Sequence, residues 1–218
     1  MPKRFELLVF DWDGTLIDSA GAIVACIQAA CRDLGLPVPA SEQASHVIGL
    51  GLSDALSYAI PGLAPSEYPR VAERYRQHFL ACDASLPLFP GTREMLDELR
   101  ARGHALAIAT GKSRAGLGRA LETTGLRSVF DATRCADQCA SKPAPDMLLE
   151  LMAELGAARE HTLMVGDTSH DLQMAANAGV AAVGVSYGAH DGARLADFAP
   201  LALLESTSAL ARWLAANA

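Results

Sequence analysis

The sequence predicts an α/β fold, a Rossmann-like doubly wound parallel sheet with an inserted α-helical cap domain. Short apolar runs alternate with helical patterns over most of the chain, which is typical of parallel strands joined by helical crossovers. The first run, residues 5–10, is broken only by Glu6 and is followed at once by acidic residues and glycine. This pattern indicates a buried strand that ends at a functional loop.

Four further runs predict the remaining strands, at residues 104–110, 129–135, 162–165 and 180–185. Helical patterns predict helices at residues 92–102, 113–124, 145–155 and 171–178. Between the first strand and Pro87 the strand signal disappears, and helices are expected at residues 20–34, 53–60 and 65–82. We therefore predict a discontinuous catalytic core, residues 1–16 and 87–218, and a helical cap over residues 17–86.

Composition narrows the class of protein. Half of the 218 residues are hydrophobic, and 18 Lys and Arg against 25 Asp and Glu give a net charge of −7. The basic residues are scattered singly, which argues against a nucleic-acid partner. No apolar run reaches the ~18 residues of a membrane span, and no signal peptide is recognisable. A cytoplasmic protein, monomeric or homodimeric, with its five cysteines reduced is the expectation.

Polar residues follow four of the predicted strands. Asp11 and Asp13 follow the first strand, Thr110 ends the second just before Gly111, Lys142 follows the third, and Asp167 and Asp171 follow the fourth. Ligands of doubly wound sheets bind at the carboxyl ends of the strands, so these side chains are expected in one crevice. Clustered carboxylates favour a hard cation such as Mg²⁺, with Lys142 as a further counter-charge.

Four motifs carry a family resemblance. The chain has DxDGTL from Asp11, the strand-terminal Thr110, Lys-Pro-x-Pro from Lys142, and GDxxxD from Gly166. In this order they resemble the motifs of haloacid dehalogenase superfamily phosphatases. The helical insertion resembles the small cap of the phosphoglycolate phosphatase-like branch.

The resemblance implies a role for each residue. Asp11 is the nucleophile that forms an aspartyl-phosphate, and Asp13 is the general acid and base. Mg²⁺ is held by the carboxylates of Asp11 and Asp167 and by the backbone carbonyl of Asp13. Thr110 and Lys142 hold phosphoryl oxygens, and Asp171 orients the metal or Lys142. Because dehalogenases generally lack an acid two residues after the nucleophile, Asp13 favours a phosphatase.

Glycines near the site have expected roles of their own. Gly14 is expected to allow the tight turn after the acids, and Thr15 and Ser19 to do no more than begin the next helix. Gly49, in the loop formed by residues 48–52, and Gly111 are predicted to bind substrate. The cap is expected to set specificity.

The predicted function is Mg²⁺-dependent hydrolysis of a small phosphate monoester, with phosphoglycolate as the first substrate to test. An inorganic pyrophosphatase or a phosphomutase of the same superfamily is the alternative. A serine hydrolase using Ser186 in Gly-x-Ser-x-Gly is disfavoured, because only His190 follows it in the chain. A receiver-type signalling domain is also disfavoured, because it has paired acids on its first strand and the phosphorylated aspartate on a separate strand. The six histidines have no ligand spacing and are expected to be structural or exposed, with the role of His170 left open.

Overall fold

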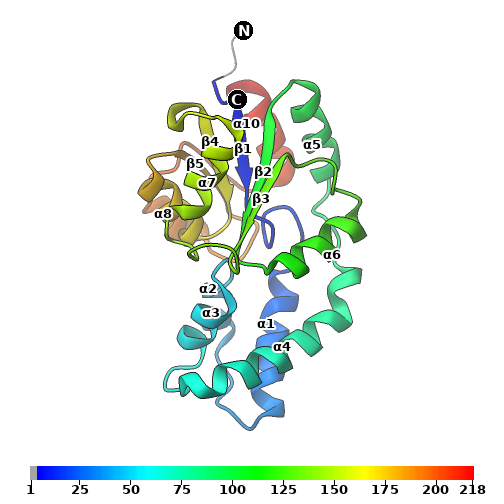
Figure 1. Cartoon of the computed structure of the whole chain (residues 1–218), viewed down its shortest axis with the longest axis vertical. Helices are drawn as coiled ribbons and strands as arrows, with labels where there is room; N and C mark the ends of the chain where they lie inside the picture. Colours follow the sequence, from blue (N-terminus) through cyan, green and yellow to red (C-terminus); the bar gives the residue numbers. More distant parts are fainter. Residues whose placement is uncertain (1–3) are drawn as a thin grey trace.

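A parallel six-stranded sheet forms the centre of the computed structural model, which describes residues 4–218 (Figure 1). The strands are ordered β3-β2-β1-β4-β5-β6. Their bounds are β1 Leu7–Phe10, β2 Ala105–Thr110, β3 Ala132–Cys135, β4 Thr162–Gly166, β5 Ala181–Val185 and β6 Leu203–Leu204. The predicted fold class is confirmed. The two-residue β6 was missed, because so short a pair of leucines has no recognisable alternation.

The position of β1 explains why its sequence is apolar throughout. It pairs with β2 and β4, so that Leu7 lies between Ala105 and Thr162. All four of its residues are fully buried. A central parallel strand is covered by helices on both faces and therefore has no polar side.

Two helical layers cover the sheet. Leu8 and Phe10 belong to the hydrophobic cluster that includes α5 (Thr92–Ala101), α6 (Arg114–Thr124) and α10 (Thr207–Asn217). Leu7 and Val9 belong to the cluster of α7 (Asp146–Leu155) and α8 (Ser169–Ala178). The side chains of β1 thus alternate between the two layers. The short α9, Gly192–Ala196, which the sequence did not predict, packs near β5 and β6.

A separate group of helices lies beyond the carboxyl edge of the sheet (Figure 1). These cap helices are α1 (Ala20–Asp33), α2 (Ser41–His46), α3 (Leu52–Ala59) and α4 (Tyr68–Cys82), with a hydrophobic cluster of their own. The sequence did not predict α2, whose six residues include only one buried side chain, Ala44. The domain boundaries at residues 16/17 and 86/87 stay a prediction, and residues 1–3 of the predicted core lie outside the described residues.

The two connections to the cap helices run side by side. Ile17 forms an antiparallel bridge with Leu88, and the backbone N–H of Asp18 donates to the carbonyl of Pro87 at 2.9 Å. Among residues 4–218, no helix is both long and apolar enough to span a lipid bilayer.

Candidate active site

A buried lysine joins two of the predicted acidic residues. Nζ of Lys142 lies 2.6 Å from Oδ1 of Asp11 and 2.6 Å from Oδ1 of Asp171. Asp11 directly follows β1, and its backbone N–H donates to the carbonyl of Val165 on β4. Lys142 is 2% exposed, and both acids are fully buried. The sheet edge therefore holds a charged cluster that is closed to bulk water.

The start of α8 fixes Asp171. In the capping box at this helix end, Oδ2 of Asp171 accepts from the backbone N–H of Thr168 at 3.0 Å. This contact leaves Oδ1 for Lys142. Of the two predicted roles for Asp171, orienting Lys142 is the one that has a contact in the structure.

Asp167 is held from two other segments. Its Oδ1 accepts from the hydroxyl of Thr15 at 2.7 Å, and its Oδ2 accepts from the backbone N–H of Ala189 at 2.7 Å. Gly14 has φ 82°, and a Cβ at this position would overlap the Asp167 carboxylate. The expected turn at Gly14 is confirmed, whereas the expectation that Thr15 only begins a helix was wrong.

Asp13 faces away from this cluster. Its Oδ1 accepts from the hydroxyl of Ser19 at 2.7 Å and from Nζ of Lys112 at 3.0 Å. Ser19 precedes α1 but makes no side-chain capping bond, so its hydroxyl serves Asp13 and not the helix end. The expectation for Ser19 was therefore also wrong. Residues two apart after a strand present their side chains to different surroundings, which separates Asp13 from Asp11.

Sequence reasoning missed Lys112. It was assigned no role from the sequence, yet Nζ of Lys112 contacts Asp13 and lies 4.5 Å from the ring centroid of Phe79 on α4. A cationic residue two positions after the strand-terminal Thr110 was the available signal. Thr110 itself is buried, and its Oγ1 accepts from the backbone N–H of Lys112 at 3.2 Å, which leaves the hydroxyl hydrogen available to donate.

Burial dominates the electrostatics of the cluster. Burial raises the pKa of Asp11 well above its ordinary value. The positive charge of Lys142 lowers this pKa, whereas the neighbouring carboxylates of Asp171 and Asp167 raise it further. Burial and the charge of Asp171 raise the pKa of Asp167 to about 7. Burial acts to lower the pKa of Lys142, but Asp11 and Asp171 outweigh it and raise that pKa. The three carboxylates, when ionised, carry more negative charge than the single ammonium of Lys142 can offset. A further cation would therefore stabilise their ionised forms.

The donor set fits a hard divalent cation. Carboxylate oxygens of Asp11, Asp167 and Asp171 lie within 4.8 Å of one another. Among residues 4–218, Oδ2 of Asp11 is a buried carboxylate oxygen with no hydrogen-bond partner. An all-oxygen set with one unsatisfied carboxylate oxygen is the type of site that binds Mg²⁺.

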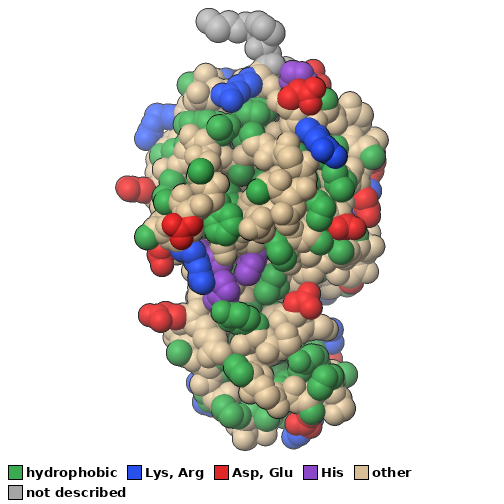
Figure 2. All heavy atoms as spheres, turned by 90° about the vertical axis from the view of Figure 1, so that its left-hand side faces the viewer, with side chains coloured by type: hydrophobic (Ala, Val, Ile, Leu, Met, Phe, Trp, Pro, Cys, Tyr) green, Lys and Arg blue, Asp and Glu red, His purple; other side chains and the backbone are tan. Residues whose placement is uncertain are grey.

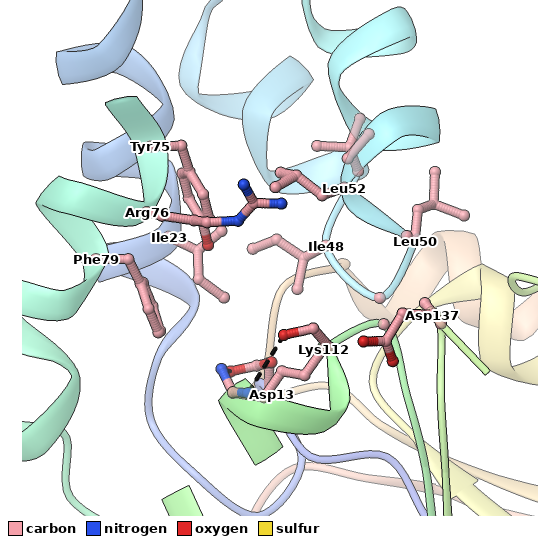
Figure 3. A pocket seen from close by; sticks show the side chains of 18 of the residues that line it. Asp13, Ile23, Ile48, Leu50, Leu52, Tyr75, Arg76, Phe79, Lys112 and Asp137 are labelled. Carbon is pink, nitrogen blue, oxygen red and sulfur yellow. Dashed lines mark hydrogen bonds and ion pairs between the residues drawn. The ribbon is translucent and has the colours of Figure 1, made fainter. Parts of the chain in front are cut away.

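A cavity of about 570 Å³ lies between the cap helices and the sheet edge (Figure 3). Asp13, Gly49, Gly111 and Lys112 all line it. A Cβ on Gly111 would lie 2.5 Å from the carbonyl oxygens of Gly49 and Leu50, so the cap loop rests directly on the end of β2. The structure thus brings Gly49 and Gly111, both predicted to bind substrate, into contact at the wall of this cavity.

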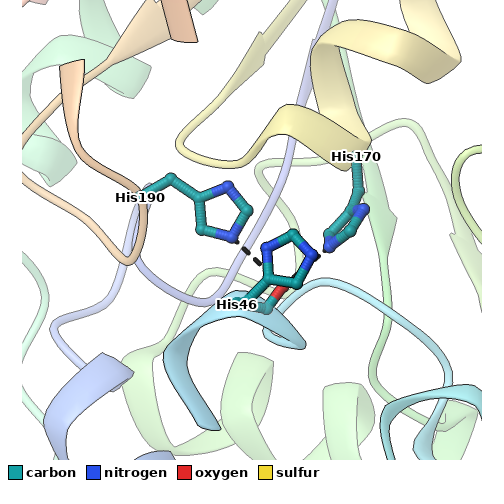
Figure 4. Close-up of side chains that lie close together, drawn as sticks. All are labelled: His46, His170 and His190. Atoms are coloured by element: carbon teal, nitrogen blue, oxygen red, sulfur yellow. Dashed lines mark hydrogen bonds between the residues drawn. The ribbon is translucent and has the colours of Figure 1, made fainter. Parts of the chain in front are cut away.

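Three histidines meet at the junction of cap and core, although their sequence positions gave no sign of it (Figure 4). Nε2 of His170 and Nε2 of His190 lie 2.8 Å and 3.1 Å from the backbone carbonyl oxygen of His46 on α2. Figure 2 shows histidine side chains at the waist between the two lobes. His170, whose role was left open, therefore joins α8 to α2.

The same contacts weaken the serine hydrolase alternative. Nδ1 of His190 accepts from the backbone N–H of Ser169 at 3.0 Å, and Nε2 faces His46. Both ring nitrogens are therefore engaged away from Ser186. His190 is 4% exposed, so it is structural and not a surface residue.

The fold and the site together define a class of protein. A doubly wound sheet with an acidic, lysine-containing pocket at its carboxyl edge, covered by helices inserted after the first strand, is typical of a hydrolase with a Rossmann-like core and a helical cap. The cysteines Cys26, Cys31, Cys82, Cys135 and Cys139 are free thiols and none lies in the acidic cluster.

Comparison with known proteins identifies the family. The profile of haloacid dehalogenase-like hydrolases matches residues 8–185. A probable phosphatase, IndB, from Dickeya dadantii is 39% identical over 209 residues, covering 93% of this chain and 90% of the relative. A phosphoglycolate phosphatase from Synechococcus elongatus is 32% identical, covering 94% and 95%. The crystal structure of a predicted phosphoglycolate phosphatase from Haemophilus somnus has a TM-score of 0.85 at 26% identity, covering 98% and 99%.

The chain belongs to the haloacid dehalogenase-like hydrolase family. The predicted family and the predicted class of enzyme, a hydrolase, are confirmed.

Proposed function

We propose that this protein is a Mg²⁺-dependent phosphatase that hydrolyses a small phosphate monoester through an aspartyl-phosphate on Asp11. The observation that carries the proposal is the asymmetric environment of the Asp11 carboxylate. Oδ1 is held at 2.6 Å by Lys142, whereas Oδ2 is buried without a partner among the described residues. One oxygen is thus fixed by a cation, and the other is available to a metal or a substrate.

The first half of the reaction is nucleophilic displacement at phosphorus. A carboxylate oxygen of Asp11 forms the new P–O bond as the bond to the leaving oxygen breaks. The ammonium of Lys142 and the hydroxyl of Thr110 donate to the transferring phosphoryl oxygens. Asp171 holds Lys142 in place at 2.6 Å.

The carboxylates of Asp11 and Asp167 and the backbone carbonyl of Asp13 would hold Mg²⁺. The ion would supply positive charge that offsets the negative charge of the phosphoryl group. Asp167 is fixed for this task by Thr15 and Ala189. The repulsion among the buried carboxylates supports a bound cation.

Asp13 carries the proton transfers. It protonates the leaving oxygen in the first half of the reaction and takes a proton from the attacking water in the second half, which releases phosphate and restores Asp11. Ser19 and Lys112 hold its carboxylate at the wall of the cavity. A leaving group in that cavity would therefore lie beside the acid.

Relatives named phosphoglycolate phosphatases make phosphoglycolate the reference compound for a substrate panel. Pyrophosphate hydrolysis and phosphomutase activity use the same residues and are the alternatives. A small phosphorylated metabolite as partner, a cytoplasmic location and a monomeric or homodimeric state complete the proposal.

The test is direct detection of the covalent intermediate. After a rapid acid quench during turnover with Mg²⁺, mass spectrometry of the peptide that contains Asp11 should show one added phosphoryl group. With para-nitrophenyl phosphate, whose leaving group needs little protonation, Asp13→Asn should accumulate this species because dephosphorylation loses its base, and Asp11→Asn should not form it. Turnover by Asp11→Asn at the wild-type rate would contradict the proposal.

A further inference from the structure

We infer that the leaving group of the substrate is an uncharged, mainly apolar alcohol or phenol, larger than the two-carbon, carboxylate-bearing glycolate. The inference rests on the proposed function and adds the substrate class to it. It follows from the position of Asp13, from the composition of the cavity and from the pairing of the charged groups around it.

The position of Asp13 fixes where the leaving group lies. The acid that protonates the leaving oxygen must be within hydrogen-bond reach of it. Asp13 lines the cavity, and Asp11 does not. The phosphoryl group at Asp11 therefore faces the acidic cluster, and the rest of the substrate extends past Asp13 into the cavity under the cap helices.

Most of the cavity lining is apolar, although Ser53, Asp54, Asp137 and Ser141 are among its polar residues. The cavity volume of about 570 Å³ is within the range of pockets that enclose most of a ligand of drug-like size. Aliphatic and aromatic side chains from α1, α3, α4 and the loop before α3 surround it: Ile23, Ile27, Val47, Ile48, Leu52 and Phe79. Five of these six are buried, and Leu52 is half-buried. A two-carbon glycolate group would contact only a few of these side chains.

The cationic side chains around the cavity are already paired. Lys112 is bound to Asp13 and lies over the ring of Phe79. Arg119 pairs with Asp83 at 3.5 Å. A substrate carboxylate deep in the cavity would therefore have to compete with Asp13 for Lys112.

The remaining cationic side chain that lines the cavity is exposed to solvent. Arg76 pairs with Glu73 at 3.7 Å, and its side chain is 58% exposed. Figure 3 shows the Arg76 side chain on the cap side of the cavity, away from Asp13. Solvent screening weakens such an exposed charge, so it provides little affinity for a short anionic group.

The experiment measures binding apart from turnover. Ethyl-, butyl- and hexylphosphonate have no leaving group, so their binding with Mg²⁺ can be followed by calorimetry in the wild-type protein. Affinity should rise with chain length by up to about 4-fold per methylene, the factor that corresponds to burying one such group. 5-Carboxypentylphosphonate should bind more weakly than hexylphosphonate. Affinity independent of length, or tighter binding of the carboxylate, would overturn the inference.

Variants locate the effect in the cavity. Leu52→Ala removes a half-buried wall residue, and Phe79→Ala removes the ring beside Lys112. Each should lower the hexyl-to-ethyl affinity ratio by about 5-fold or more, since several methylene contacts are lost. Val38→Ala is the control, because Val38 is 44% exposed in the cap and does not line the cavity. An unchanged ratio in both folded variants would refute the assignment to this cavity.

Hydrolysis of acetyl phosphate separates this inference from the proposed function. Its leaving group is small and needs little protonation, so turnover requires Asp11 but not the apolar walls. Turnover with length-independent phosphonate binding would leave the phosphatase intact and remove the apolar substrate class. Absence of turnover would count against the proposed function, while the phosphonate series would still decide what the cavity binds.

Discussion

The ammonium of Lys112 lies 3.0 Å from Oδ1 of Asp13, in a contact whose two side chains are only 10% and 9% exposed. The same ammonium lies over the ring of Phe79, so one side chain from the end of β2 links the proposed acid to helix α4 of the cap. We regard Lys112 as a positioning residue for Asp13.

Replacing Lys112 should therefore impair protonation of the leaving group. Lys112→Met should lower kcat/KM for an alkyl phosphate by about 10- to 100-fold, the effect of losing a hydrogen bond to a charged group. Lys112→Arg, which keeps the charge, should restore part of the loss. Equal kcat/KM values for Lys112→Met and the wild type would show that the contact has no role in the reaction.

The role of Asp13 can be tested through leaving-group chemistry. Asp13→Ala should lower kcat/KM much more for an alkyl phosphate, which leaves as a basic alkoxide, than for para-nitrophenyl phosphate, which leaves as a stabilised phenolate. The loss for the alkyl substrate should be about 10²- to 10⁴-fold. Asp11→Ala should abolish both reactions. Equal losses in a folded, metal-binding Asp13→Ala protein would mean that Asp13 is not the leaving-group acid.

Metal removal should abolish activity. Excess chelator should stop turnover and Mg²⁺ should restore it, whereas Ca²⁺, with its longer and looser coordination, should support it poorly. Because a ligand that binds only the native state stabilises it, Mg²⁺ should also raise the Tm. Asp167→Asn should lose this Tm increase. Full turnover of metal-free protein in chelator would exclude the metal.

The close contact between Gly111 and the cap loop predicts a selective effect on KM. Gly111→Ala places a Cβ 2.5 Å from the carbonyl oxygens of Gly49 and Leu50, which must then move away from the sheet edge. KM should rise several-fold, and the substrate ranking should change, while the circular dichroism spectrum stays the same. Gly118→Ala is the matched control, since no atom lies within 4 Å of the added Cβ. A rise of KM in both variants would show that the effect is not specific to the loop.

The histidine junction predicts a dependence of stability on pH. Burial lowers the pKa of His190 to about 4, so the unfolded chain, with an ordinary histidine pKa of ~6.5, binds the proton more tightly than the folded one. Its contribution is therefore present above pH ~6.5 and is lost as pH falls toward 4. The loss would amount to about 3 kcal/mol at most.

The measurement compares urea unfolding of the wild type and His190→Gln at pH 7, 6 and 5. Titrating groups that do not contact His190, such as Asp167, affect both proteins alike, so the difference between them reports on His190 and its contacts with His46 and His170. The free energy of unfolding should fall more steeply with decreasing pH in the wild type. Parallel curves would contradict the assigned pKa of His190.

The sequence by itself determined five of the six strands and placed the polar residues that follow four of them at one edge of the sheet. Residues 5–10 and four similar runs are apolar because helices cover both faces of a parallel sheet, so that the side chains on both faces are buried. A continuous apolar run of this kind can be recognised in the sequence alone. The polar residues after those runs were expected at one edge because the carboxyl ends of parallel strands lie on the same side of the sheet. Asp11, Lys142, Asp167 and Asp171 could therefore be predicted to lie together from the sequence.

Only the tertiary structure decided the contacts between side chains that are far apart in the sequence. Lys112 reaches Asp13, and His170 and His190 reach the carbonyl of His46, across sequence separations of 99, 124 and 144 residues. No periodicity records such pairs, since each depends on how separate elements pack together. The apolar cavity has the same origin. Its lining residues read as ordinary core positions of amphipathic helices, and only the packing of those helices leaves a space between them beside Asp13.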